Sequence, residues 1–161
     1  MDTDILVIGG GPAGLAFARQ FAGSPLRLTV LEQAPPETLQ HPPYDGREIA
    51  LTHRSAEILQ RLDIWQRIPA NEIYRLRDAK VYNGTSDYTL HFPEPARARG
   101  GKTDRLGNLI SNHNIRRAAY LAVADTPNVT LRCGTGVKTV ATDQQSALSL
   151  IRISEPTRPL Y

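Results

Sequence analysis

The residues best suited to chemistry lie near the start of the chain. Gly9, Gly11 and Gly14 have the spacing G-x-G-x-x-G, with Pro12 and Ala13 between the last two glycines. In this motif the first glycine permits a tight turn, the second lets a pyrophosphate approach the backbone, and the third lets a helix pack closely on a strand. Free N–H groups and a partial positive charge at the helix start hold the dianion. The spacing therefore predicts a dinucleotide-binding turn.

A carboxylate stands where the ribose of such a dinucleotide is expected. Glu32 lies 18 residues after Gly14 and is followed by Gln33, and the motif places a ribose-binding acid about 20 residues on. A carboxylate there also repels a 2′-phosphate, which argues against NADP. The alternative is a glycine-rich turn without a ligand and an ordinary charge at a strand end. The register of strand, glycines, helix and acid favours dinucleotide binding.

The elements that must position these residues form a βαβ unit. Residues 4–8 (DILVI) and 26–31 (LRLTVL) are apolar runs typical of buried parallel strands. Between them, Phe17 and Phe21 share one face of a predicted helix. Residues 34–46 contain four prolines and predict an ordered loop.

Further elements are predicted along the rest of the chain. A helix is expected from Thr52, whose hydroxyl can cap its first turn, to about residue 62. A turn at Asn83-Gly84, of two residues or more, separates two strands. The remaining expected elements are strands at 72–82, 88–92, 128–131 and 136–141 and a helix at 112–124.

The segment after the loop resembles a known family. Residues 45–52 (DGREIALT) precede a helix that ends at 62–65 (LDIW). This pattern resembles the class A flavoprotein monooxygenases, in the branch of the ubiquinone-biosynthesis hydroxylases. In that family the arginine lies against the flavin, so the resemblance implies that Arg47 binds cofactor. A surface salt bridge of Arg47 with Asp45 or Glu48 is the alternative.

A second segment resembles the part of the family that touches FAD on its other side. It consists of 106–107 (LG), Asn112 and 115–118 (IRRA). The resemblance implies a cofactor contact for Arg116. For at least one of Arg116 and Arg117, a solvated helix face is the stronger interpretation.

A third segment resembles the strand pair that covers the adenine in related flavoproteins. It consists of 127–131 (PNVTL), Gly134 and Val137, and the resemblance implies contacts of Val137 with the cofactor. Asn108 and His113 depart from the family pattern, but the resemblance extends over roughly residues 4–141.

The resemblance implies an α/β fold: a three-layer, Rossmann-like FAD-binding domain, truncated, with the first strands of a substrate-binding sheet. We expect residues 1–147 to form this partial domain, with the piece of substrate sheet inserted around 72–110. The implied full-length enzyme uses FAD, NAD(P)H and O₂ to hydroxylate a small aromatic, prenylated substrate. Two later flavin-binding motifs of the family fall beyond residue 161, so we expect these 161 residues alone to bind FAD weakly or not at all and to be inactive.

Two other functions stay open. One is a different flavin oxidoreductase, of the prenyl reductase or amine oxidase type, which shares the glycine motif and Glu32 but not the Arg47 segment. The other is a non-catalytic nucleotide-binding module.

The composition excludes several classes of site. Apolar residues make up 40% and charged residues 22% of the chain, as in soluble globular domains, and no apolar run reaches the ~18 residues of a membrane span. The single cysteine, Cys133, excludes an internal disulfide, and the four histidines lack metal-ligand spacing. We expect no metal, no catalytic side chain in this part of the enzyme and a cytoplasmic location. Peripheral contact of the full-length enzyme with the inner membrane stays open.

The net charge of +3 raises the question of nucleic-acid binding. The one local basic cluster has no interleaved aromatic residues to stack on bases. We therefore expect a solvated loop and no nucleic-acid partner. The cluster consists of Arg97, Arg99, Lys102 and Arg105.

The last residues, 148–161 (LSLIRISEPTRPLY), resemble a translated transposon adapter used in sequencing libraries. We expect this tail to be non-native and derive no function from it. The alternative is a genuine proline-rich tail.

Overall fold

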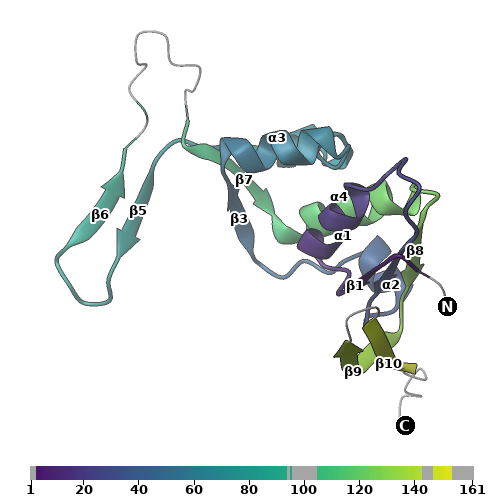
Figure 1. The fold of residues 1–161 in the computed structure, drawn as a ribbon. Coiled ribbons are helices and arrows are strands. Elements are labelled where there is room, and N and C mark those ends of the chain that lie inside the picture. Colours follow the sequence, from purple (N-terminus) through teal and green to yellow (C-terminus); the bar gives the residue numbers. More distant parts are fainter. Residues whose placement is uncertain (1–2, 94, 96–104, 143–146, 154–161) are drawn as a thin grey trace, which may run out of the picture.

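The computed structural model describes residues 3–93, 95, 105–142 and 147–153 (Figure 1). Three residues of the basic cluster, Arg97, Arg99 and Lys102, lie outside this part of the chain, as do residues 154–161 of the tail.

A small parallel sheet carries the glycine turn. Its strands are β1 (Ile5–Ile8), β2 (Leu28–Leu31) and β8 (Val129–Arg132), in the order β1-β2-β8. All four residues of the central strand β2 are buried, as expected for a strand covered on both faces. Helices α1 (Pro12–Arg19) and α4 (Asn112–Ala124) pack against each other beside the sheet. The predicted strands at 4–8, 26–31 and 128–131 and the helix at 112–124 are confirmed.

A second, antiparallel sheet follows. It contains β3 (Glu48–Leu51), β7 (Gly107–Ser111) and β4 (Tyr74–Leu76), with β7 in the middle. Helix α3 (His53–Arg61) begins where predicted, because Thr52 Oγ1 accepts a hydrogen bond from the backbone N–H of Ser55 at 3.1 Å. Capping of this kind satisfies one of the otherwise unpaired N–H groups of the first turn.

The prediction of one continuous strand over 72–82 is wrong. A 3₁₀ turn (Ala70–Glu72) precedes β4, and the chain then changes partner: β4 pairs with β7, whereas β5 (Ala79–Tyr82) pairs with β6 (Thr89–Phe92). Strand propensity is continuous along this stretch, but pairing partners are set by tertiary contacts. Figure 1 shows the β5–β6 hairpin projecting away from the rest of the molecule. Six residues join its strands, so the turn at Asn83-Gly84 is longer than two residues.

The prediction that 34–46 contains no regular element is also wrong. A short helix, α2 (Pro36–Gln40), lies in this loop and buries Leu39. Pro35 is its N-cap and Pro36 its first helical residue. Proline is tolerated there because its fixed φ suits a helix and the N–H it lacks has no intrahelical acceptor at that position.

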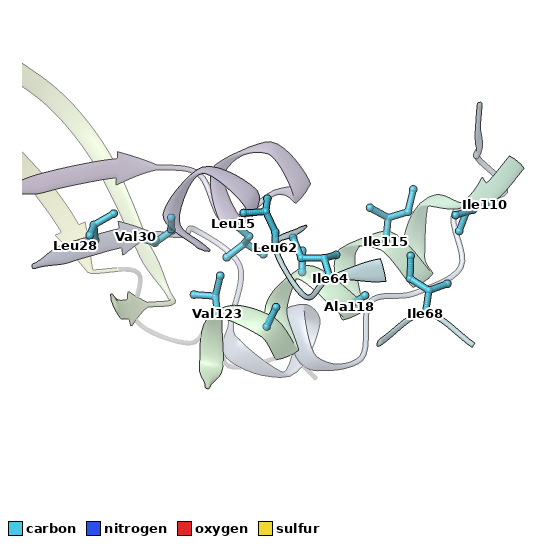
Figure 2. Packing of buried hydrophobic residues seen from close by; sticks show 13 residues of the cluster. Leu15, Leu28, Val30, Leu62, Ile64, Ile68, Ile110, Ile115, Ala118 and Val123 are labelled. Carbon is cyan, nitrogen blue, oxygen red and sulfur yellow. The ribbon is translucent and has the colours of Figure 1, made fainter. Parts of the chain in front are cut away.

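The core lies between β2, α1 and α4 and continues toward β7 (Figure 2). Aliphatic side chains from segments far apart in the sequence form this core. Among the described residues, no helix is long and apolar enough to cross a membrane. The largest fully buried side chains of the core are those of Leu15, Leu28, Val30, Ile64, Ile110 and Val123.

The chain ends in an antiparallel pair of strands. β9 (Thr135–Thr142) contains the predicted strand 136–141, and β10 (Ala147–Ile153) pairs with it, with a register shift between Leu150 and Ile151. β10 thus includes the first residues of the segment that we expect to be non-native. Backbone pairing does not depend on the source of a sequence, so the expectation stays a prediction.

Candidate dinucleotide site

The turn between β1 and α1 has a backbone that only glycine accommodates at two positions. Gly9 has φ +102°, in the region that favours glycine, and its N–H donates to the carbonyl oxygen of Leu31 at 2.8 Å. A Cβ on Gly14 would lie 2.1 Å from the carbonyl oxygen of Gly9 and 3.3 Å from Val7 Cγ1. Gly9 and Gly14 are therefore required by the backbone and the packing alone, whether or not a ligand binds.

Gly11 differs, because nothing within 4 Å would meet a Cβ placed on it. It is the N-cap of α1 with an extended backbone, and no side chain caps this helix start. Pro12, the first helical residue, has no N–H, whereas the N–H groups of Ala13 and Gly14 lack intrahelical acceptors by position. Open space beside free N–H groups and the positive end of a helix dipole suits an anion.

Glu32 is fixed beside this turn. Its Oε2 accepts a hydrogen bond from the backbone N–H of Gly10 at 2.6 Å, and its Oε1 accepts one from the backbone N–H of Ala34 at 2.7 Å. Each carboxylate oxygen can accept a second hydrogen bond. The carboxylate of this half-buried residue is thus oriented by two backbone donors and retains capacity for a ligand hydroxyl.

Three partners of Glu32 were not selected from the sequence. They are Gly10, Ala34 and Thr135, whose backbone N–H donates to the carbonyl oxygen of Glu32 at 2.8 Å. The sequence signal for Gly10 was its place as the middle glycine of the run 9–11. The structure gives the reason, because a Cβ there would lie 3.1 Å from both Glu32 Cβ and Leu39 Cδ2. The other two contribute through the backbone, and no residue type marks such a role.

Gln33 and Val137 lie on either side of this junction. Gln33 is exposed and directly follows Glu32. Val137 is half-buried in β9, two residues after Thr135, the strand residue bonded to Glu32. The structure therefore brings the glycine turn, Glu32, Gln33 and the start of β9 to the carboxyl end of β2, where ligands bind in open α/β sheets.

Arg47 forms the salt bridge that the sequence left open as an alternative. Its Nε donates to Asp45 Oδ2 at 2.8 Å, and the same oxygen accepts from Asn112 Nδ2 at 2.7 Å. Hydrogen bonds from the Arg47 side chain, followed by that from Asn112, hold the pKa of the Asp45 carboxyl well below its usual range. The Arg47 side chain is nevertheless 67% exposed, so the ion pair does not occupy all of its donors.

Arg116 lies in the first half of α4, the helix that Asn112 begins. The backbone N–H of Asn112 donates to the carbonyl oxygen of Arg47 at 2.8 Å, so this helix starts next to the Arg47 segment. Arg116 is half-buried and has no hydrogen-bond or ion-pair partner among the described residues, while Arg117 is exposed. Within that part of the chain, no hydrogen bond or ion pair joins Arg47 or Arg116 to the glycine turn.

Cys133 is poorly suited to act as a nucleophile. Burial, followed by the charges of Glu32 and Glu37, raises the pKa of its thiol, and a thiol that stays protonated reacts slowly. No group of three or more His, Cys, Asp or Glu side chains among the described residues could hold a metal ion. A surface hollow of about 550 Å³ lies beside Cys133 at the carboxyl end of β8, and its lining includes Pro36, Tyr120, Leu131, Arg132 and Thr135.

Known proteins with an FAD-binding domain are similar to this chain. The chain matches the family described as FAD binding domain over residues 2–153. It is 60% identical over 147 residues to ubiquinone hydroxylase UbiM of Neisseria meningitidis, and the aligned region covers 91% of this chain and 32% of that protein. It is 28% identical over 129 residues to ubiquinone hydroxylase UbiL of Rhodospirillum rubrum, covering 80% of this chain and 29% of that protein. The chain spans about a third of the length of these relatives.

Solved structures share the fold. The p-nitrophenol 4-monooxygenase of Pseudomonas putida aligns with a TM-score of 0.64 at 20% identity, over 91% of this chain and 35% of that one. A geranylgeranyl bacteriochlorophyll reductase-like protein of Thermoplasma acidophilum aligns with a TM-score of 0.63 at 19% identity, over 94% of this chain and 35% of that one. The predicted α/β FAD-binding fold is confirmed. Because the names of these two proteins differ in reaction type, fold alone does not separate a hydroxylase from a reductase.

Proposed function

This chain belongs to the FAD-binding domain family, and we propose that it forms the FAD-holding N-terminal part of a hydroxylase that oxidises an aromatic ring in ubiquinone biosynthesis. The 60% identity to a protein named ubiquinone hydroxylase supports this function over the reductase and amine oxidase alternatives. The observation that carries the cofactor assignment is the Glu32 carboxylate, held by two backbone donors beside an open, uncapped helix start.

The described residues fit the ADP half of FAD. The space at Gly11 and the first-turn N–H groups of Ala13 and Gly14 suit the pyrophosphate. The remaining acceptor capacity of Glu32 suits the ribose hydroxyls. We assign Gln33 and Val137, on the two sides of the Glu32 junction, to the adenine end.

The flavin half is assigned to the Arg47 segment and to α4. Arg47 keeps exposed guanidinium donors despite its bond to Asp45. Arg116 is a half-buried cation without a partner among the described residues, and such a group gains from an acceptor supplied by a ligand. Both sit on elements joined through Asn112, which argues for one common site.

When bound, FAD supplies the redox chemistry: reduction by NAD(P)H and activation of O₂ for insertion of an oxygen atom into the ring. The residues of this chain bind and orient the cofactor, and none is assigned to proton transfer. We propose a small aromatic substrate that carries a prenyl chain, a cytoplasmic location and peripheral contact of the full-length enzyme with a membrane.

The full-length protein encoded by this gene tests the proposal. We expect it to purify with stoichiometric flavin and, with NAD(P)H and a prenylated phenol, to form a product heavier by one oxygen atom. Incubation under ¹⁸O₂ should label that oxygen. A product with two added hydrogens and no oxygen would instead identify a reductase, and absence of flavin binding would refute the assignment.

A further inference from the structure

The carboxylate of Asp45 connects a loop, a strand start and a helix start. Its Oδ2 accepts from Arg47 Nε at 2.8 Å and from Asn112 Nδ2 at 2.7 Å, and its Oδ1 accepts from the backbone N–H of Arg47 at 3.2 Å. The Asp45 side chain is only 24% exposed, against 67% for that of Arg47. The carboxylate is therefore partly shielded from solvent by its donors, while most of the Arg47 side chain stays accessible.

Asn112 anchors this arrangement in the fold. It is buried, and its backbone N–H donates to the carbonyl oxygen of Arg47 at 2.8 Å while its side chain donates to Asp45. The neighbouring residues Glu48 and Ser111 are partners in the β3–β7 ladder. Asp45 is thus bonded to a buried residue at the start of α4 as well as to the exposed Arg47 side chain.

The bonds to Asp45 leave part of the guanidinium free. A guanidinium has five N–H donors, and Asp45 engages Nε and one donor of Nη2. The remaining donors form the outer edge. A free arginine loses much rotamer freedom when a ligand fixes it, whereas Arg47 is already held. Its charge is also compensated, so this edge favours directional hydrogen bonds to neutral acceptors such as ring carbonyl oxygens.

We propose that Asp45 is a positioning residue that holds Arg47 in the orientation in which its outer edge meets the flavin, with Asn112 holding Asp45 in turn. This inference rests on the proposed function, in which Arg47 contacts FAD. Ordering one flexible side chain at binding weakens affinity by about 2- to 12-fold. Loss of Asp45 should therefore weaken FAD binding by about that factor and only while Arg47 is present.

The test is a double-mutant cycle in the full-length protein. We would measure FAD and ADP affinities of the apoprotein for Asp45→Ala, Arg47→Ala and the double variant, with the visible spectrum of bound flavin and the melting temperature of each. Asp45→Asn, which keeps the shape, serves if Asp45→Ala does not fold. Asp4→Ala is the matched control, since Asp4 also pairs with an arginine, Arg27, but before the start of β1.

The expected result is weaker FAD binding in Asp45→Ala, unchanged ADP binding, and no loss of FAD affinity in the double variant beyond that of Arg47→Ala. Additive losses, or a parallel fall in ADP affinity, would overturn the inference and leave the proposed function intact. Unchanged FAD binding in Arg47→Ala would also overturn it, while binding through the glycine turn would stand. Failure of the unaltered protein to bind FAD would refute the proposed function itself.

Discussion

Replacement of Gly11 by alanine separates binding from folding. The added Cβ meets nothing within 4 Å, and the residue has φ −74° and ψ 176°, which alanine adopts without strain. Alanine is a poorer N-cap than glycine, but it also lowers the entropy of the unfolded chain, and each effect is on the order of 0.5–1 kcal/mol with opposite sign. We therefore expect an unliganded melting temperature close to that of the unaltered protein.

The same methyl group would occupy the space assigned to the pyrophosphate. Losing a hydrogen bond to a charged group costs about 1.5–3 kcal/mol, which corresponds to a roughly 10- to 150-fold weaker Kd for FAD and for ADP. Quenching of FAD fluorescence on titration with full-length apoprotein measures the Kd for FAD. Thermal melts without ligand measure the stability of the same variant.

Gly14→Ala is the matched control in the same turn. Its Cβ would lie 2.1 Å from the backbone oxygen of Gly9, which cannot move aside as a side chain can. Overpacking of this kind costs about 1–3 kcal/mol or more, so this variant should melt at a lower temperature before any ligand is added. If Gly11→Ala bound FAD normally, the pyrophosphate would not approach this glycine, and the reasoning from open space would be wrong.

Three further outcomes are expected. Glu32→Gln replaces an acceptor facing either Gly10 or Ala34 by an amide donor, so FAD affinity should fall by about 10-fold or more; an unchanged Kd by the same titration would exclude ribose binding here. Because the pKa of Asp45 is lowered in the folded state, the carboxylate contributes its full stabilisation above the unfolded pKa of about 3.9 and loses it as the pH falls below that value. Between pH 6 and pH 3, the free energy of unfolding in urea should therefore fall less for Asp45→Asn than for the unaltered protein. Thr52→Ala removes the α3 cap and should destabilise by about 1 kcal/mol in urea unfolding without affecting ADP binding; weaker ADP binding would mean that α3 reaches the site.

Much of the site's frame was predictable because it is local. The β1 run, the glycine spacing and the helix that follows lie within a few residues of one another, and each is dictated by backbone sterics and periodicity. The clash at Gly14 and the positive φ of Gly9 follow from the same rules. The cap at Thr52 is likewise a local hydrogen bond that residue type signals.

Long-range contacts decided the rest. The N–H of Gly10 meets a carboxylate 22 residues away, and Asp45 meets Asn112 across 67 residues. The change of strand partner between β4 and β5 depends on the position of β7, which comes later in the chain.

The sequence by itself determined the residue types available to a dinucleotide and the turn that presents them. Only the tertiary structure decided which acceptors remain free, that Arg47 bonds to Asp45, and that Arg116 has no partner among the described residues. The physical reason is that hydrogen-bond satisfaction and burial are properties of neighbours in space, which spacing along the chain does not specify.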